Sequence, residues 1–170
     1  PCLVAFRTLA VMVVAMATAL GAPALAGQAA APGDTAVTKT AAQISDSLLF
    51  AGDSEAAYSV LVARLGVFPD DFEARWRATR AALGLGIMGA DADTRRHWLQ
   101  EADAQGRALL LLRPDDAEAM AWAAAARGRR ALAEPGARTV VGLAEETWQL
   151  TGKLLAAHPD HPLGNHVRGK

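Results

Sequence analysis

The chain has 170 residues, which is enough for one domain of ordinary size. Its formal net charge of −1 gives no electrostatic reason to expect nucleic acid or an anionic membrane surface as a partner. Forty residues are alanine, the strongest helix former, and β-branched residues are sparse beyond the N-terminal stretch. We therefore expect an all-α protein.

The first 26 residues have the layout of a cleavable signal peptide. Arg7 is followed by an uncharged apolar run over residues 9–20 and by a small-x-small site at residues 24–26. The run has 12 residues, fewer than the ~20 that span a bilayer, so cleavage after Ala26 is favoured over an uncleaved N-terminal membrane anchor. We expect a periplasmic or secreted protein in which residues 27–34 form a linker. The only cysteine, Cys2, would leave with the signal peptide.

Two helices are predicted before the first internal proline. A helix over residues 35–50 is expected to be capped by Thr35. A second helix, which ends at Gly66, is expected to be capped by Asp53 or Ser54. This pair has the length of a helical-hairpin repeat unit.

A second pair of helices is predicted after Pro69. The first of these helices is expected to end at Gly84, because three glycines follow one another closely from that position. Residues 87–93 are predicted to form a flexible insertion. The second helix, over residues 95–112, is expected to start at position 93 or 94.

The same scheme recurs after Pro114. Asp116 is expected to cap a helix that Pro135 ends, and another helix is predicted over residues 138–157. Pro162 suits the first turn of a further helix.

Three prolines mark the boundaries of these pairs at a fixed interval. Pro69, Pro114 and Pro159 are spaced 45 residues apart, and each is followed by Asp. A fixed interval of this kind indicates a repeat architecture, in which each unit contacts its neighbours. The sequence therefore predicts a solenoid of helical hairpins with elongated, 45-residue units.

The unit boundaries resemble the tetratricopeptide repeat family. The matching segments are residues 52–58 with 68–71, 106–109 with 113–119, and 158–162 with 166–169. They cover most of residues 35–170, which we take as the repeat domain. The 45-residue spacing and the run at residues 128–133 are similar to a bacterial exported subgroup, that of the regulator of microtubule dynamics proteins. The pattern departs from the family at the first-helix position that usually holds a large residue, which is Arg75 in one unit and Met120 in the next.

Two groups of polar residues have both a chemical and a structural interpretation. The acid pairs Asp70–Asp71 and Asp115–Asp116 each follow a proline at a helix start, so capping is favoured over acid–base chemistry. The cluster of His158, His161 and His166 is interrupted by prolines and lacks the usual spacing of metal ligands. We interpret it as a turn followed by a packed or solvated histidine, and expect no metal site.

No familiar catalytic motif supports an enzyme. The glycines of residues 84–89 match a dinucleotide-binding fingerprint only superficially, because no strand is predicted before them. Hydrolase, zinc-protease and redox signatures do not occur. We expect neither catalysis nor a cofactor.

Each long predicted helix holds one tryptophan: Trp76, Trp98, Trp122 and Trp148. Core packing is the main interpretation, and the alternative is that one or two line a binding groove. The resemblance implies that the first helix of each pair lines such a groove. On those helices the candidate partner-binding residues are Trp76, Arg80, Arg129 and His166, and both arginines are suited to hold a carboxylate. An ordinary solvated face is the alternative for the arginines.

The sequence thus predicts a non-enzymatic, exported scaffold that binds a protein or peptide and not nucleic acid. The alternative is a helical accessory subunit that binds a small ligand beside a membrane transporter. Because the chain starts with Pro1 and stops at Lys170 within a helical pattern, we interpret it as part of a longer protein. A third alternative is therefore an enzyme whose active residues follow Lys170. The identity of the partner and the oligomeric state stay open.

Overall fold

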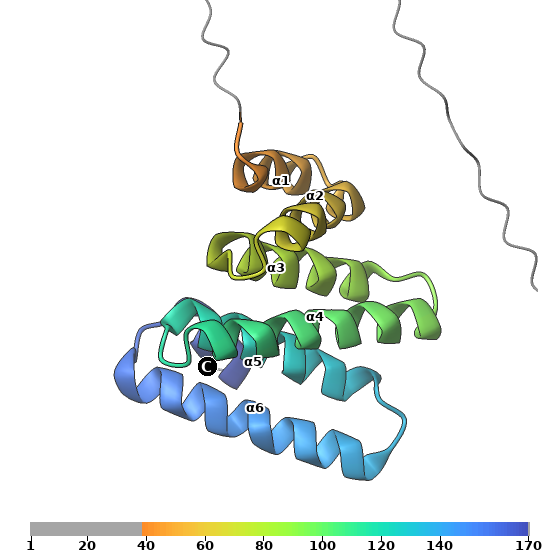
Figure 1. The fold of residues 1–170 in the computed structure, drawn as a ribbon. Helices are drawn as coiled ribbons and strands as arrows, with labels where there is room; N and C mark the ends of the chain where they lie inside the picture. Colours follow the sequence, from red (N-terminus) through yellow and green to blue (C-terminus); the bar gives the residue numbers. More distant parts are fainter. Residues whose placement is uncertain (1–38, 170) are drawn as a thin grey trace, which may run out of the picture. The chain divides into compact units, whose positions relative to one another are not determined.

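A computed structural model describes residues 39–169 (Figure 1). This part of the chain contains seven helices and no strand, which confirms the all-α expectation. The helices are α1 (Ala41–Phe50), α2 (Ser54–Val67), α3 (Phe72–Met88), α4 (Ala92–Leu112), α5 (Ala117–Ala133), α6 (Ala137–Ala157) and α7 (Pro162–Arg168). The predicted signal peptide and linker lie outside the described residues.

The helices pack in chain order, each against the next (Figure 1). Contacts also join α1 to α3, α3 to α5 and α5 to α7, whereas no such contacts link α2 to α4 or α4 to α6 in the described residues. The odd-numbered helices therefore lie next to one another on one side of the stack. We call the surface formed by α1, α3, α5 and α7 the first-helix face. None of the seven helices is long and apolar enough to cross a membrane.

The residues after each of the three spaced prolines start a helix. The side chain of Asp71 accepts a hydrogen bond from the Ala74 N–H, and that of Asp116 accepts one from the Ala119 N–H, each at 3.0 Å. The capping interpretation of both acid pairs is thus confirmed for the second acid of each. In the third case the Nδ1 atom of His161 accepts from the Gly164 N–H at 3.2 Å. A cap of this kind stabilises a helix by about 1 kcal/mol.

The first helix starts later than predicted. Its cap is Thr40, whose side chain accepts from the Gln43 N–H while the Gln43 side chain accepts from the Thr40 N–H. This reciprocal pair satisfies two backbone donors at once, which a single hydroxyl does not. Thr35 lies outside the described residues, and positions 39 and 40 are not helical, so the prediction of a continuous helix from Thr35 is wrong.

The predicted ending of α3 at Gly84 is also wrong. The helix continues to Met88, and α4 begins at Ala92, so the flexible insertion reduces to residues 89–91. Asp91, and not position 93 or 94, caps α4 by accepting from the Thr94 N–H at 2.8 Å. Most of the interval between the spaced prolines is helix: α3 and α5 have 17 residues each, and α4 and α6 have 21 each.

Glycines inside the helices allow close packing. An ideal Cβ at Gly86 would lie 2.6 Å from the Cγ of Leu99, and one at Gly106 would lie 2.9 Å from the Cα of Ala123. Such distances are too short for a methyl group, so these glycines let α3 and α5 approach α4 closely. Gly86, which the sequence suggested as a helix breaker, is a packing residue.

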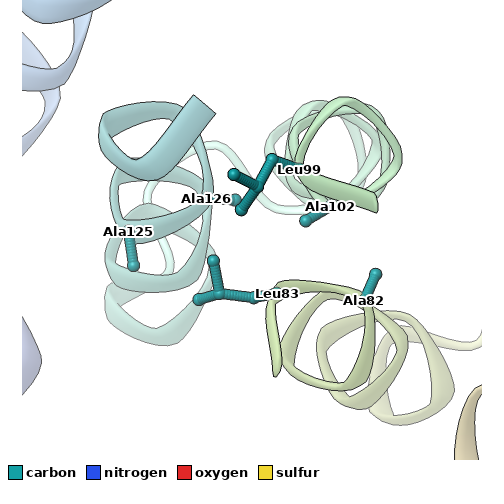
Figure 2. Packing of buried hydrophobic residues seen from close by; sticks show 6 residues of the cluster. All are labelled: Ala82, Leu83, Leu99, Ala102, Ala125 and Ala126. Carbon is teal, nitrogen blue, oxygen red and sulfur yellow. The ribbon is translucent and has the colours of Figure 1, made fainter. Parts of the chain in front are cut away.

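The core between α3, α4 and α5 consists largely of small side chains (Figure 2). Its buried members are Ala82, Leu83, Leu99, Ala102, Ala125 and Ala126. Leu83 and Leu99 fill the space that the four alanines leave between the helices (Figure 2). Because each alanine buries little apolar area, much of the packing depends on the close approach of the backbones.

Candidate functional site

All four predicted partner-binding residues lie on odd-numbered helices: Trp76 and Arg80 on α3, Arg129 on α5 and His166 on α7. The structure brings them together in two pairs. Trp76 and Arg80 line one hollow beside α1, together with Asp46, Leu49, Phe50 and Gly84. Arg129 and His166 line a second hollow between α3, α5, α6 and α7. We call these the Trp76 hollow and the His166 hollow.

An aromatic pair bridges α3 and α5. The ring of Trp76 stacks on that of Trp122, with centroids 6.0 Å apart and planes inclined by 18°. Each indole N–H donates to a glutamate of its own helix: Trp76 Nε1 to Glu73 at 3.0 Å and Trp122 Nε1 to Glu118 at 2.9 Å. Both rings are half-buried, and their orientation is fixed by stacking on one side and by a hydrogen bond at the edge.

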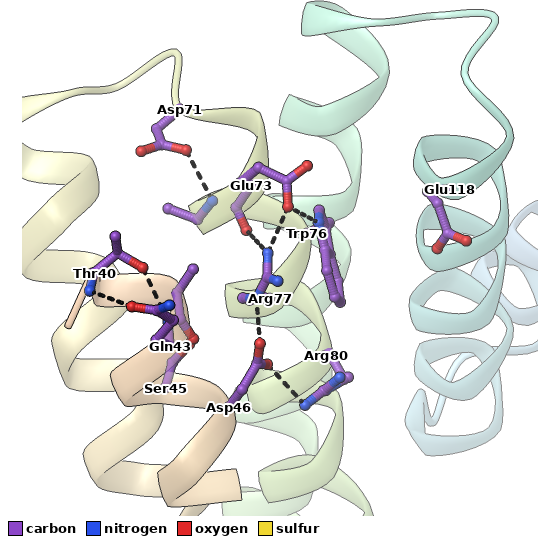
Figure 3. A network of polar contacts seen from close by, with 12 residues as sticks. Thr40, Gln43, Ser45, Asp46, Asp71, Glu73, Trp76, Arg77, Arg80 and Glu118 are labelled. Atoms are coloured by element: carbon purple, nitrogen blue, oxygen red, sulfur yellow. Dashed lines mark hydrogen bonds and ion pairs between the residues drawn. The ribbon is translucent and has the colours of Figure 1, made fainter. Parts of the chain in front are cut away.

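Two arginines of α3 lie beside the ring of Trp76 (Figure 3). The guanidinium carbon of Arg77 is 4.2 Å from the Trp76 ring centroid, and that of Arg80 is 5.6 Å away. Arg77 also binds Glu73 at 2.6 Å, and its hydrogen bond, followed by that of Trp76, holds the pKa of Glu73 below the usual range. The cluster is therefore charged on both sides of the ring, with cations over its face and an anion at its edge.

Asp46 of α1 connects the first hairpin to this cluster. Its two carboxylate oxygens accept separately, one from Arg77 Nε at 3.0 Å and the other from Arg80 at 3.3 Å. If Arg80 turned away, Asp46 would keep Arg77 as its partner. The Arg80 contact is long and both side chains are partly exposed, so breaking it costs roughly 0–1 kcal/mol. Arg80 can thus exchange Asp46 for the carboxylate of a ligand.

The His166 hollow has a more apolar lining than the Trp76 hollow and a volume of about 460 Å³. Its apolar walls are Leu83, Ile87, Ala125, Leu132, Leu163 and Val167. Arg129 is exposed at its edge and makes no ion pair with any acid among residues 39–169. This hollow therefore combines apolar walls with one uncompensated cation.

The three histidines of the predicted turn have separate positions. His158 is exposed after the end of α6, and His166 lines the hollow described above. His161 caps α7, and its Nε2 atom lies 3.8 Å from a carboxylate oxygen of Glu118. No group of three or more potential metal ligands occurs among the described residues.

Three features of the cluster around Trp76 were not predicted from the sequence: the contacts of Asp46, the contacts of Arg77 and the stacking of Trp122. For Trp122 the sequence contained a signal. Arg77 and Trp122 are 45 residues apart, the same interval as the spaced prolines, so the predicted repeat would place them on the same face. The role of Asp46 had no such signal, because α1 belongs to a pair of different length.

A scan against known protein-family models gives no match for this chain, and a search of curated proteins gives none either.

Proposed function

We propose that this protein is a non-catalytic scaffold that binds a protein or peptide on the first-helix face, and that its hairpins form a tetratricopeptide-like solenoid. The observation that carries the proposal is the Trp76–Trp122 stack with Arg80 beside it, on the same face as Arg129. Tryptophan and arginine are the residues that most often dominate binding energy at protein interfaces. Both tryptophans pack partly against the core but are only half-buried, and Arg80 is half-buried and Arg129 exposed.

The arrangement of the two hollows favours an elongated ligand. The Trp76 hollow lies between α1 and α3, whereas the His166 hollow is lined by α3, α5, α6 and α7. A ligand that reaches both has to cross α3, and an extended peptide meets that requirement better than a compact metabolite. Its acidic groups would bind Arg80 and Arg129, and its apolar side chains would occupy the walls near Leu132.

We further propose that the protein is exported after cleavage of residues 1–26. The support is the order of Arg7, the apolar run and the small-residue site in the sequence. N-terminal sequencing of the exported protein should find Gly27 first. An exported form that begins before Ala24 would contradict the proposed cleavage and favour the membrane anchor.

A selection experiment tests the binding proposal. Peptides selected from a random library on the wild-type protein would be titrated against Arg80→Glu, Arg129→Glu and the control Arg138→Glu. Arg138 is exposed on α6 and lines neither hollow. We expect each groove variant to weaken binding at least tenfold, about 1.4 kcal/mol, and the control to bind like the wild type. Selected peptides that bind all four proteins equally would contradict the proposal.

A further inference from the structure

A third hollow shares Ile87, Arg129 and Leu132 with the His166 hollow and adds residues of α4. It is formed by the C-terminal ends of α3 and α5 and the first turns of α4, with a volume of about 460 Å³. Its lining includes Arg95, which belongs to α4 and not to the first-helix face. We call it the Arg95 hollow. Arg129 borders both this hollow and the His166 hollow.

Two cations without acidic partners border the Arg95 hollow. Neither Arg95 nor Arg129 makes an ion pair within residues 39–169, although both are arginines of helices rich in ion pairs. Their sequence neighbours differ in this respect: Arg96 binds Asp93 at 3.1 Å, and Arg130 binds Asp103 at 2.7 Å. The two guanidinium groups at this hollow are therefore uncompensated.

Asp91 and Glu134, which are adjacent in sequence to lining residues of this hollow, already have partners. Glu134 accepts from Arg130 at 3.0 Å and from Gln100 at 3.1 Å. Asp91 accepts from both the backbone and the hydroxyl of Thr94, and these hydrogen bonds are the main reason that its pKa is lowered, with Arg95 a smaller contributor. The two exposed guanidinium groups are thus open to an added anion.

The remaining walls are apolar. Ile87, Leu99, Leu132 and Ala133 line the hollow. Leu132 is 79% exposed, so its side chain is accessible to a ligand. Leu99 packs closely against Gly86 and closes the hollow on the side of α3. The walls thus fit a hydrocarbon group, whereas a sugar phosphate would leave them without a partner.

We propose that the Arg95 hollow binds a small aliphatic carboxylate. The carboxylate lies between Arg95 and Arg129, where planar guanidinium groups hold its two oxygens. The hydrocarbon chain lies along Ile87, Leu99 and Leu132. The volume is within the range of small-molecule sites, so a chain of moderate length is accommodated. The same chemistry occurs in a free acid and in the last residue of a peptide that ends in leucine.

Titration of the whole protein with octanoate tests this proposal. Octanol and octylamine share the chain but lack the carboxylate, and should bind at least tenfold more weakly. Arg95→Gln and Arg129→Gln should each weaken octanoate binding at least tenfold, and Arg138→Gln should leave it unchanged. A short leucine-terminated peptide with a free carboxylate forms a second arm, and the tighter of the two ligands identifies the source.

Two results would overturn the proposal: octanol binding as tightly as octanoate, or Arg95→Gln binding octanoate like the wild type. Because the Arg95 side chain is exposed and makes no ion pair, its replacement should leave the thermal transition unchanged, which circular dichroism checks. The site is also separable from the proposed scaffold function. Arg95→Gln should leave peptides selected for the first-helix face bound, and Arg80→Glu should leave octanoate bound.

Discussion

Replacement of Asp103 by Asn should lower the free energy of unfolding by about 3 kcal/mol. Asp103 on α4 is 1% exposed and accepts hydrogen bonds from three arginines. Arg107 is 2.8 Å away on the same helix, and Arg127 and Arg130 of α5 are 3.0 Å and 2.7 Å away. The carboxylate therefore joins α4 to α5 at the centre of the stack.

The magnitude follows from what remains after the substitution. Removing one partner of a buried ion pair costs about 3–5 kcal/mol, because a charge is left buried without compensation. Here Arg127 keeps Glu146 at 3.1 Å and Arg130 keeps Glu134 at 3.0 Å, so neither arginine is left without an acid. The lower end of the range therefore applies. For a domain of this size it corresponds to a decrease in Tm of about 10 °C.

Urea denaturation followed by circular dichroism measures this difference, with Arg107→Gln as the matched control. Arg107 contacts the same carboxylate, but its side chain is 51% exposed, so its loss should cost under about 1 kcal/mol. If Asp103→Asn were destabilised no more than Arg107→Gln, the carboxylate would not hold α4 and α5 together in the way described.

Two other predictions concern the packing and the titration of single residues. Gly106→Ala should destabilise the protein by about 1–3 kcal/mol, because its Cβ would lie 2.9 Å from the Cα of Ala123. The control Gly142→Ala meets nothing within 4 Å and should stabilise α6 by up to about 1 kcal/mol. Equal effects of the two substitutions in thermal melts would contradict the described packing. Burial, the hydrogen bond donated to Glu101 and the charge of that carboxylate raise the pKa of Tyr58, the only tyrosine. A raised pKa in the folded state gives stability that is complete below about pH 10 and is lost as the pH rises further. The ultraviolet absorbance of the phenolate should therefore appear at a higher pH than that of a free tyrosine, and a titration of folded protein near pH 10 would refute this.

Local proline signals predicted three helix starts. Proline followed by Asp gave the starts of α3 and α5, and Pro162 gave that of α7, whereas the starts of α1 and α4 were predicted wrongly. The end of α3 was not predictable in this way. Gly84 and Gly86 resemble helix breakers locally, and only the approach of Leu99 from α4 shows that Gly86 is needed within the helix.

The candidate site, like the helix boundaries, was predictable from the sequence only in part. The helical period and the repeat interval place Trp76, Arg80 and Arg129 on the first helices, where the structure has them. Long-range ion pairs decide which arginines of these helices are free to bind a ligand. Asp46 reaches Arg80 across 34 positions of the sequence, and Asp103 reaches Arg130 across 27, so no local pattern announces either pair.

The indole N–H signals of the four tryptophans test the proposed binding face most directly. In a nuclear magnetic resonance titration with a selected peptide, Trp76 and Trp122 should shift, because they form the stacked pair on that face. Trp98 on α4 and Trp148 on α6 should not move, although Trp148 is 60% exposed. Single Trp→Phe variants assign the signals. Shifts of Trp148 with unchanged Trp76 and Trp122 would place the peptide on the even-numbered helices and contradict the account.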